Sequence, residues 1–149
     1  MRNLRILIIF LALLIPGSAL AQDNKVFRIG IDASADFFLA PDHMAMPSFG
    51  LGARARVGRY DQWLNFVGGV RYIYGERLSG IQVPLLVNVN LLKGSRVSGY
   101  LGGGFEFDFI GRYLGAMKIQ TGVAGRHMDI RVFYKPYQGD LGAGFTYYF

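Results

Sequence analysis

The stretch FRIGIDASADF at residues 27–37 alternates apolar and polar side chains along its whole length. Its odd-numbered positions hold Phe, Ile, Ile, Ala, Ala and Phe, and its even-numbered positions hold Arg, Gly, Asp, Ser and Asp. Successive side chains of a β-strand point to opposite faces, so a two-residue period indicates a strand. The stretch therefore predicts a β-strand with one apolar face and one polar face.

The same period recurs through the rest of the chain, with turn-forming residues between the runs. The further runs lie at residues 49–58, 64–74, 81–91, 97–109, 117–125, 130–135 and 141–149. Strands of this length joined by short connections are typical of antiparallel sheets whose strands pair in chain order. We therefore expect an all-β fold, an eight-stranded antiparallel up-and-down β-barrel. Because the limits of the last three runs are not sharp, a barrel of ten strands stays open as an alternative.

Residues 1–21 have the form of a secretory signal peptide. Arg2 and Arg5 precede an apolar run at residues 6–15, and Ala19-Leu20-Ala21 offers a cleavage site. The run is too short for a membrane-spanning helix, which needs about 20 apolar residues. We expect Sec export, cleavage after Ala21 and one mature domain at residues 22–149. Without Cys in the chain, neither a lipid-bearing cysteine nor a disulfide can form.

Composition excludes several classes of protein. With 52% hydrophobic and 17% charged residues and no Cys, the chain is not a disordered, collagen-like or disulfide-stapled protein. The formal net charge is +6, and loss of the two leader arginines lowers it to about +4 by count. This charge is not a strong signature of nucleic-acid binding. We therefore expect no nucleic-acid partner.

The polar faces of the predicted strands carry charges, whereas the apolar faces carry none. The charged positions are Arg28, Asp32, Asp36, Arg54, Arg56, Arg71, Glu106, Asp108, Lys118, Arg131 and Lys135. An eight-stranded barrel is only wide enough for its side chains to fill, so we expect these groups to pair in an interior network. Inward glycines would make room for the long side chains. Because cations exceed acids by three in this set, a narrow path that favours anions stays open as an alternative.

Two features favour an eight-stranded transmembrane β-barrel, whose apolar face points outward to lipid. The apolar face is uncharged and holds more bulky side chains than a small barrel could easily enclose. Aromatic residues also gather near the strand ends, as in the interfacial girdles of membrane barrels. One rim would hold Phe37, Phe38, Phe49, Tyr72, Tyr74, Phe107, Phe109, Tyr113, Tyr134 and Tyr137, and the other Phe27, Tyr60, Trp63, Tyr147 and Phe149. The alternative is a soluble periplasmic barrel with an apolar ligand inside.

The end of the sequence adds a third feature. Gly144, Tyr147 and Phe149 fit a Gly-x-x-aromatic-x-aromatic pattern. This pattern resembles the signal by which the barrel assembly machinery recognises outer-membrane barrels, although Gly142 stands where that signal usually has a polar residue. The expected partners are therefore outer-membrane lipid and the assembly machinery, for a barrel that we expect to be monomeric.

Residues 80–87 (GIQVPLLV), 93–95 (KGS) and 100–105 (YLGGGF) carry a family resemblance. They resemble the Pro-Leu-Leu strand, tight turn and glycine-rich strand of the porin-like outer-membrane β-barrel domain family of Bacteroidetes. The resemblance implies the fold and an outer-membrane location, and it transfers no catalytic residues. Pro84 lacks an N–H for the sheet, so we expect a local bulge at this position.

The connections follow from an N-terminus on the periplasmic side, as in even-stranded barrels. The predicted periplasmic turns are Arg59–Gln62, Lys93–Arg96 and Arg126–Asp129. The predicted outer loops are Leu39–Pro47, Gly75–Ser79, Ile110–Ala116 and Tyr137–Asp140. All the outer loops are short, and Leu39–Pro47 is the best candidate for a contact surface.

Few residues offer catalytic or metal-binding chemistry. A lipid-modifying hydrolase would need a His with a Ser or acidic partner near the outer rim. His43 lies next to Asp42 in the first outer loop, with Ser48 five residues further on, while His127 lies in a predicted inner turn beside Asp129. Neither set forms a recognisable motif, and two ligands from one loop do not make a zinc site. We predict no enzyme activity, no catalytic or metal site and no cofactor, and keep a lipid-modifying hydrolase as an alternative to a structural or interaction role.

Overall fold

The computed structural model describes residues 26–39, 47–75, 79–109 and 115–149. All regular elements within these residues are strands, as the sequence predicted. They are β1 (Phe27–Phe38), β2 (Pro47–Val57), β3 (Leu64–Gly75), β4 (Gly80–Lys93), β5 (Val97–Asp108), β6 (Ala116–Gly125), β7 (Met128–Lys135) and β8 (Asp140–Tyr148). None of the described residues forms a helix that is long and apolar enough to cross a membrane. The predicted leader, residues 1–21, lies outside the described residues.

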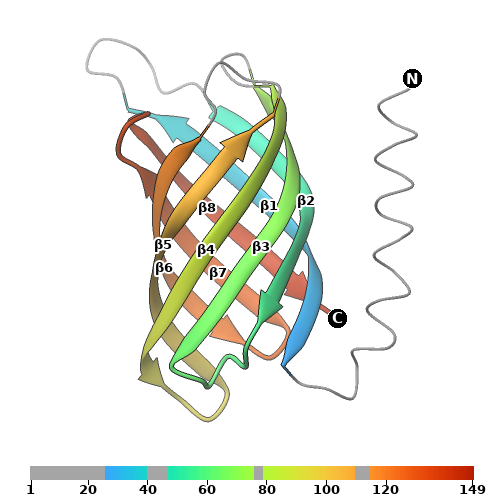
Figure 1. Ribbon diagram of the computed structural model, residues 1–149, viewed down its shortest axis with the longest axis vertical. Helices are drawn as coiled ribbons and strands as arrows, with labels where there is room; N and C mark the ends of the chain where they lie inside the picture. The colour runs from blue at the N-terminus through green and yellow to red at the C-terminus, as the bar shows by residue number, and fades with distance from the viewer. Residues whose placement is uncertain (1–25, 40–46, 76–78, 110–114) are drawn as a thin grey trace.

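The strands close into a single barrel in chain order, from β1 to β8. Each strand pairs antiparallel with the next, and β1 pairs with β8 from Gly30 opposite Tyr148 to Phe38 opposite Asp140. Figure 1 shows the strands strongly tilted against the long axis, as closure of a sheet requires. The structure confirms the eight-stranded up-and-down barrel, and within the described residues there is no further strand pair.

The two ends of the barrel differ in their connections. One end, called the turn end below, carries the connections at residues 58–63, 94–96 and 126–127, together with the start of β1 and the end of β8. It lies at the bottom of Figure 1. The opposite end, called the loop end, carries the other four connections. Three of them lie largely outside the described residues, which include only the edges of the predicted loops Leu39–Pro47, Gly75–Ser79 and Ile110–Ala116.

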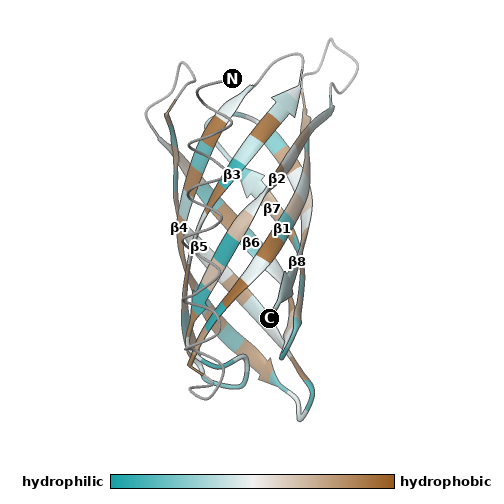
Figure 2. Ribbon diagram, turned by 90° about the vertical axis from the view of Figure 1, so that its right-hand side faces the viewer, coloured by the Kyte–Doolittle hydropathy of each residue, from teal (hydrophilic) through white to brown (hydrophobic). Residues whose placement is uncertain are grey.

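Side chains alternate between the outside and the inside of the barrel along every strand. In β7, for example, every second side chain from Asp129 to Lys135 is buried. Leu51 and Leu85 on the outside are 64% and 54% exposed, whereas Arg71 on the inside is 2% exposed. Figure 2 shows this alternation as brown and teal bands along the strands. The predicted register is therefore confirmed, with the apolar face outward.

Inward-facing glycines allow the interior to hold long side chains. A Cβ atom added to Gly144 would lie 2.7 Å from the guanidinium carbon of Arg131, and one added to Gly142 would collide with the ring of Phe133. At Gly52 an added Cβ would meet the backbone of the neighbouring β3. Glycine thus leaves space for a charged or aromatic side chain at positions 144 and 142, and for the neighbouring strand at position 52.

The prediction of a bulge at Pro84 is wrong. The pairing of β3 with β4 omits two consecutive residue pairs, that of Pro84 and the next one, but it resumes in the same register from Arg71 opposite Gln82. The ladder thus loses its pairing locally without an extra residue, and Pro84 stays paired with Glu106 of β5. The register of β4 against β5 shifts instead between Asn90 and Leu92. A missing N–H therefore interrupts one ladder here without changing the strand alignment.

Candidate functional site

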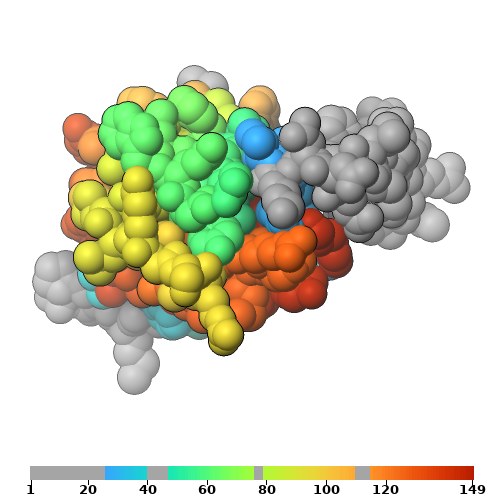
Figure 3. All heavy atoms as spheres, turned by 90° about the horizontal axis from the view of Figure 1, so that it is seen from below, coloured from blue at the N-terminus to red at the C-terminus, as the bar shows by residue number. Residues whose placement is uncertain are grey.

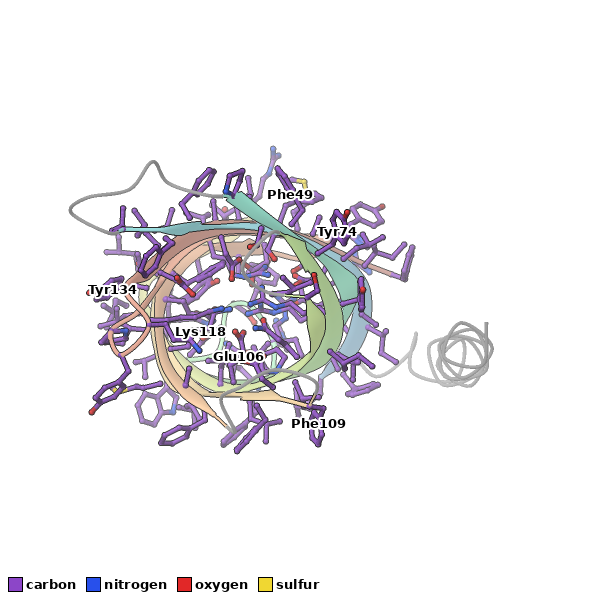
Figure 4. The ribbon with its side chains drawn as sticks, turned by 90° about the horizontal axis from the view of Figure 1, so that it is seen from above. Phe49, Tyr74, Glu106, Phe109, Lys118 and Tyr134 are labelled. Carbon is purple, nitrogen blue, oxygen red and sulfur yellow. The ribbon has the colours of Figure 1, made fainter. Side chains whose placement is uncertain are left out.

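The candidate site is the charged interior of the barrel. Nine of the eleven predicted interior charges are buried there. They are Asp32, Asp36, Arg54, Arg56, Arg71, Glu106, Lys118, Arg131 and Lys135. Arg28 and Asp108, at the two ends of the barrel, are only partly buried. Figure 4 shows Glu106 and Lys118 pointing into the barrel, while Phe49, Tyr74, Phe109 and Tyr134 point away from it.

Glu106 of β5 is the centre of the cluster nearer the loop end. Its Oε2 lies 2.7 Å from Nη2 of Arg71 and 2.9 Å from Nζ of Lys118. Its Oε1 lies 2.7 Å from Nζ of Lys135. Three cations from β3, β6 and β7 thus converge on one carboxylate that is 1% exposed. Buried charges of this kind are tolerated only when they are paired, so Glu106 holds the three strands' cations together.

Asp36 of β1 completes this cluster. Nζ of Lys135 donates a 2.8 Å hydrogen bond to its Oδ2, and Nη2 of Arg71 lies 3.6 Å from the same oxygen. The ring of Phe133 packs under the cations, with Nζ of Lys118 3.7 Å from its centroid. A cation over an aromatic face is attracted by the ring quadrupole. Phe133 therefore adds to the stabilisation of Lys118.

Neutral side chains accept the remaining hydrogen bonds of the Arg71 guanidinium. Its Nη1 donates to Oγ of Ser34 at 2.8 Å. Its Nε and Nη2 both donate to Oε1 of Gln82, at 3.1 and 2.9 Å. With the bond to Glu106, every nitrogen of this guanidinium has a partner, and its planar fork is held in one orientation.

A second cluster surrounds Asp32 nearer the middle of the barrel. Nη2 of Arg131 lies 2.5 Å from Oδ1 of Asp32, and the hydroxyl of Thr146 donates to the same oxygen at 2.6 Å. Arg131 also donates to the Thr146 hydroxyl at 2.8 Å. Arg54 approaches this carboxylate more distantly, with Nη1 3.9 Å from Oδ1. Residues of β1, β2, β7 and β8 therefore meet at Asp32.

Other contacts cross the barrel between strands that are not neighbours. Nη2 of Arg54 on β2 donates to Oε1 of Gln120 on β6 at 3.3 Å. Gln120 in turn donates to Oδ1 of Asn88 on β4 at 2.7 Å. Arg56, closer to the turn end, donates to the main-chain oxygen of Gly125 on β6 at 3.1 Å. In a ring of eight strands β2 and β6 are opposite, so these contacts span the interior.

Two interior acids were not among the predicted charges. The sequence predicts Asp129 in a turn and Asp140 in a loop, but they lie in β7 and β8 and are 0% and 2% exposed. The hydroxyl of Tyr100 donates to Oδ1 of Asp129 at 2.8 Å. Both acids lie at the start of their strands and keep the two-residue period, which was the signal that could have placed them. With them, the interior charges named here are seven cations and six acids.

The residues considered for hydrolysis do not form a site in the described part of the chain. Ser48 faces the interior and is 4% exposed, and His43 and Asp42 lie outside the described residues. His127 lies at the turn end, where its Nδ1 is 3.1 Å from the main-chain oxygen of Tyr148. No group of three or more metal-ligating side chains occurs among the described residues.

The three residues of the predicted assembly signal lie on β8 and just after it. Tyr147 and Phe149 are on the outer surface, 46% and 50% exposed, with their rings edge to face at 5.7 Å between centroids. Gly144 faces inward against Arg131. The two aromatic side chains thus form a small exposed pair at the turn end.

Comparisons with known proteins support the fold. Neither a scan against protein-family models nor a search of the curated proteins finds a match, so no family model supports the resemblance to porin-like domains. Among solved structures, the chain is similar to one described as "De novo design of transmembrane beta-barrels". The TM-score is 0.54 at 12% sequence identity, over 82% of this chain and 95% of that one. The chain therefore shares the fold of a designed β-barrel.

Proposed function

We propose that the protein is a small outer-membrane β-barrel of a Gram-negative bacterium, with a structural or interaction role and no enzyme activity. The observation that carries this proposal is the distribution of side chains between the two faces. The interior holds the paired charges, whereas large apolar side chains cover the outside, with Leu51, Phe66 and Phe105 all more than half exposed. Such a surface is unfavourable in water and favourable in lipid.

The aromatic residues support the same location. At the loop end, Phe49, Tyr74 and Phe109 are 60%, 70% and 69% exposed. At the turn end, Trp63 and Phe149 are 63% and 50% exposed. Aromatic side chains at both ends of an apolar band are typical of barrels that are anchored at two membrane interfaces. The predicted Tyr113 of this set lies outside the described residues.

The interior favours a closed barrel over a conducting one. Contacts from β2 to β6 and from β3 to β5 cross the interior at several levels. Asp129 and Asp140 reduce the excess of interior cations from three to one, which weakens the argument for an anion path. We therefore propose that the interior network is a plug that holds the barrel rigid.

A soluble ligand-binding barrel and a lipid-modifying hydrolase have less support. A soluble barrel with an apolar ligand would need an apolar interior, but the largest fully buried side chains include Arg54, Arg71 and Arg131. A hydrolase that used Ser48 would need this residue to be accessible, and it is buried. The resemblance of β4 and β5 to porin-like domains is part of our proposal and rests on the sequence pattern alone.

Membrane fractionation of the expressed protein tests the proposal, together with gel mobility before and after boiling. We expect recovery in the outer-membrane fraction and a band whose mobility shifts on heating, because a closed barrel stays folded in mild detergent. Recovery as a soluble periplasmic protein without a shift would refute the membrane location. Planar-bilayer recordings of the same material would show steady conductance if the interior were open.

Replacement of Phe149 tests the predicted role of the assembly machinery. We expect Phe149→Ala to lower the amount of assembled protein in cells but to leave refolding of the purified protein in detergent unchanged. Phe109→Ala, which removes an exposed Phe at the loop end, is the matched control. Equal losses for both variants in cells would contradict a specific assembly signal.

A further inference from the structure

The turn end of the barrel has a cavity with an unusual lining. It has a volume of about 150 Å³ and is lined by Arg28, Arg59, Tyr60 and Arg126. These residues come from the start of β1, the β2–β3 connection and the β6–β7 connection. Figure 3 shows this end of the molecule, with the blue start of β1, the green β2–β3 turn and the orange β6–β7 turn gathered on one face. Three segments far apart in the sequence thus bring three guanidinium groups to one cavity.

Two of these guanidinium groups have most of their hydrogen-bonding capacity unused. The side chain of Arg126 has no acidic or hydrogen-bonding partner among the described residues. Arg28 has one long contact, a 3.5 Å hydrogen bond from Nη1 to the main-chain oxygen of Phe149. Arg126 and Arg56 also act on Arg28 as repelling like charges. The cavity therefore holds two guanidinium groups, of Arg28 and Arg126, that no acidic side chain among the described residues pairs with.

The remaining lining residues already have partners. Arg59 is held by Asp61, with Nε 2.9 Å from Oδ1 and Nη2 2.5 Å from Oδ2. The hydroxyl of Tyr60 donates to the main-chain oxygen of Ser95 at 2.8 Å. These contacts hold the β2–β3 connection in place, so Arg59 and Tyr60 form a fixed side of the cavity. Arg28 and Arg126 supply the guanidinium N–H groups that can donate to a ligand.

We propose that this cavity binds a phosphate group, with Arg28 and Arg126 as its main ligands. The planar fork of a guanidinium matches two oxygens of a phosphate and keeps its charge at any physiological pH. A cavity volume of about 150 Å³ is large enough for a small oxyanion. A bound anion would also relieve the repulsion between the arginines.

The location of the cavity indicates where the phosphate comes from. If the barrel spans the membrane as proposed above, the turn end lies at the level of the lipid headgroups, beside the exposed Trp63 and Phe149. The phosphodiester of a phospholipid headgroup and free inorganic phosphate share the chemistry that the cavity recognises. This inference rests on the proposed membrane location for its lipid source, but not for binding of the phosphate group itself.

Isothermal titration of the purified protein in dodecyl maltoside, without phosphate buffer, tests the inference. The probes are inorganic phosphate and short-chain phosphatidylglycerol, with chloride at matched ionic strength as the reference. We expect Arg28→Gln and Arg126→Gln each to weaken phosphate-group binding by about tenfold, the loss of one charge-assisted contact. Arg96→Gln is the matched control because Arg96 is exposed in the β4–β5 connection at the same end and does not line the cavity.

Each outcome of the titration decides the inference. Binding of either probe that is weakened in the two cavity variants but not in Arg96→Gln supports it, and the tighter probe identifies the source. Equal weakening in all three variants means general attraction to a basic surface and overturns it. No binding of either probe to protein with a heat-shifted band also overturns it, while the proposed membrane location would stand. Binding by a protein that fractionates as soluble would retain the phosphate site and refute only the lipid source.

Discussion

Replacement of Glu106 by Gln is the sharpest test of the interior network. The change keeps the size of the side chain and removes one negative charge from a carboxylate that is 1% exposed and contacts three cations. Arg71 would keep Ser34, Gln82 and the more distant Asp36. Among the described residues, the contact that Lys118 would keep is the ring of Phe133, which contributes less than an ion pair.

The loss of stability follows from the buried cation of Lys118, which the change leaves without its counter-charge. Removal of one partner from a buried ion pair costs roughly 3–5 kcal/mol, because the other charge stays buried without a counter-charge. We expect Glu106→Gln to lower the free energy of unfolding by about this amount. Replacement of Lys118 by Met in the same chain removes the stranded cation, so the double variant Glu106→Gln/Lys118→Met should recover part of the loss.

Urea unfolding of the refolded barrel in detergent, followed by tryptophan fluorescence and by the heat-shifted band, measures both effects. Asp61→Asn is the control, because it breaks the exposed pair with Arg59 and should cost less than about 1 kcal/mol. A loss for Glu106→Gln as small as that of the control would refute the reasoning. It would mean that water enters the interior and screens the cations.

The geometry makes three further predictions. Gly144→Val should cost about 1–3 kcal/mol in urea unfolding, because a side chain there collides with Arg131, whereas the outward Gly103→Ala should be tolerated. Leu85→Arg, on the outside near the middle of β4, should destabilise the barrel by roughly 2–4 kcal/mol in phospholipid vesicles, and an unchanged stability would argue against lipid contact. Asn90→Ala removes hydrogen bonds to two main-chain oxygens of the β2–β3 connection. It should speed amide hydrogen exchange in this connection without opening the barrel. Exchange as slow as in the native protein would show that Asn90 does not hold the connection in place.

The two-residue period was sufficient to predict the strands and the side on which each residue lies. This period reports only local geometry, and burial of the polar face follows because every strand of a closed barrel shares one interior. The same period placed Glu106, Lys118 and Arg131 inside without identifying their partners. Asp129 and Asp140 keep this period as well, but polar residues next to turns are typical of loops, so the sequence alone predicts these two acids outside the strands.

The partners of the interior charges could not be predicted from the sequence. Contact between Glu106 and Lys135, or between Arg54 and Gln120, depends on how far each strand is shifted against the next around the barrel, and the pattern within one strand does not contain that shift. The arginine cavity was missed for the same reason, since its residues come from three separate segments. At Pro84 the prediction assumed that a missing donor needs an extra residue, but the sheet accommodates it by local loss of pairing.

The ion pairs between β1 and β7 have a consequence for how the protein folds. Asp32 and Asp36 on β1 find their closest cations, Arg131 and Lys135, 99 residues later on β7. A chain that emerges from its N-terminus therefore exposes two carboxylates and an unpaired strand edge until the last quarter of the sequence is present. Contacts with such long sequence separation slow folding because the intervening loop must be closed first. A truncated chain lacks the closest cations for β1, Arg131 and Lys135, as well as its second pairing strand, so only the complete chain gains the stabilisation of closure.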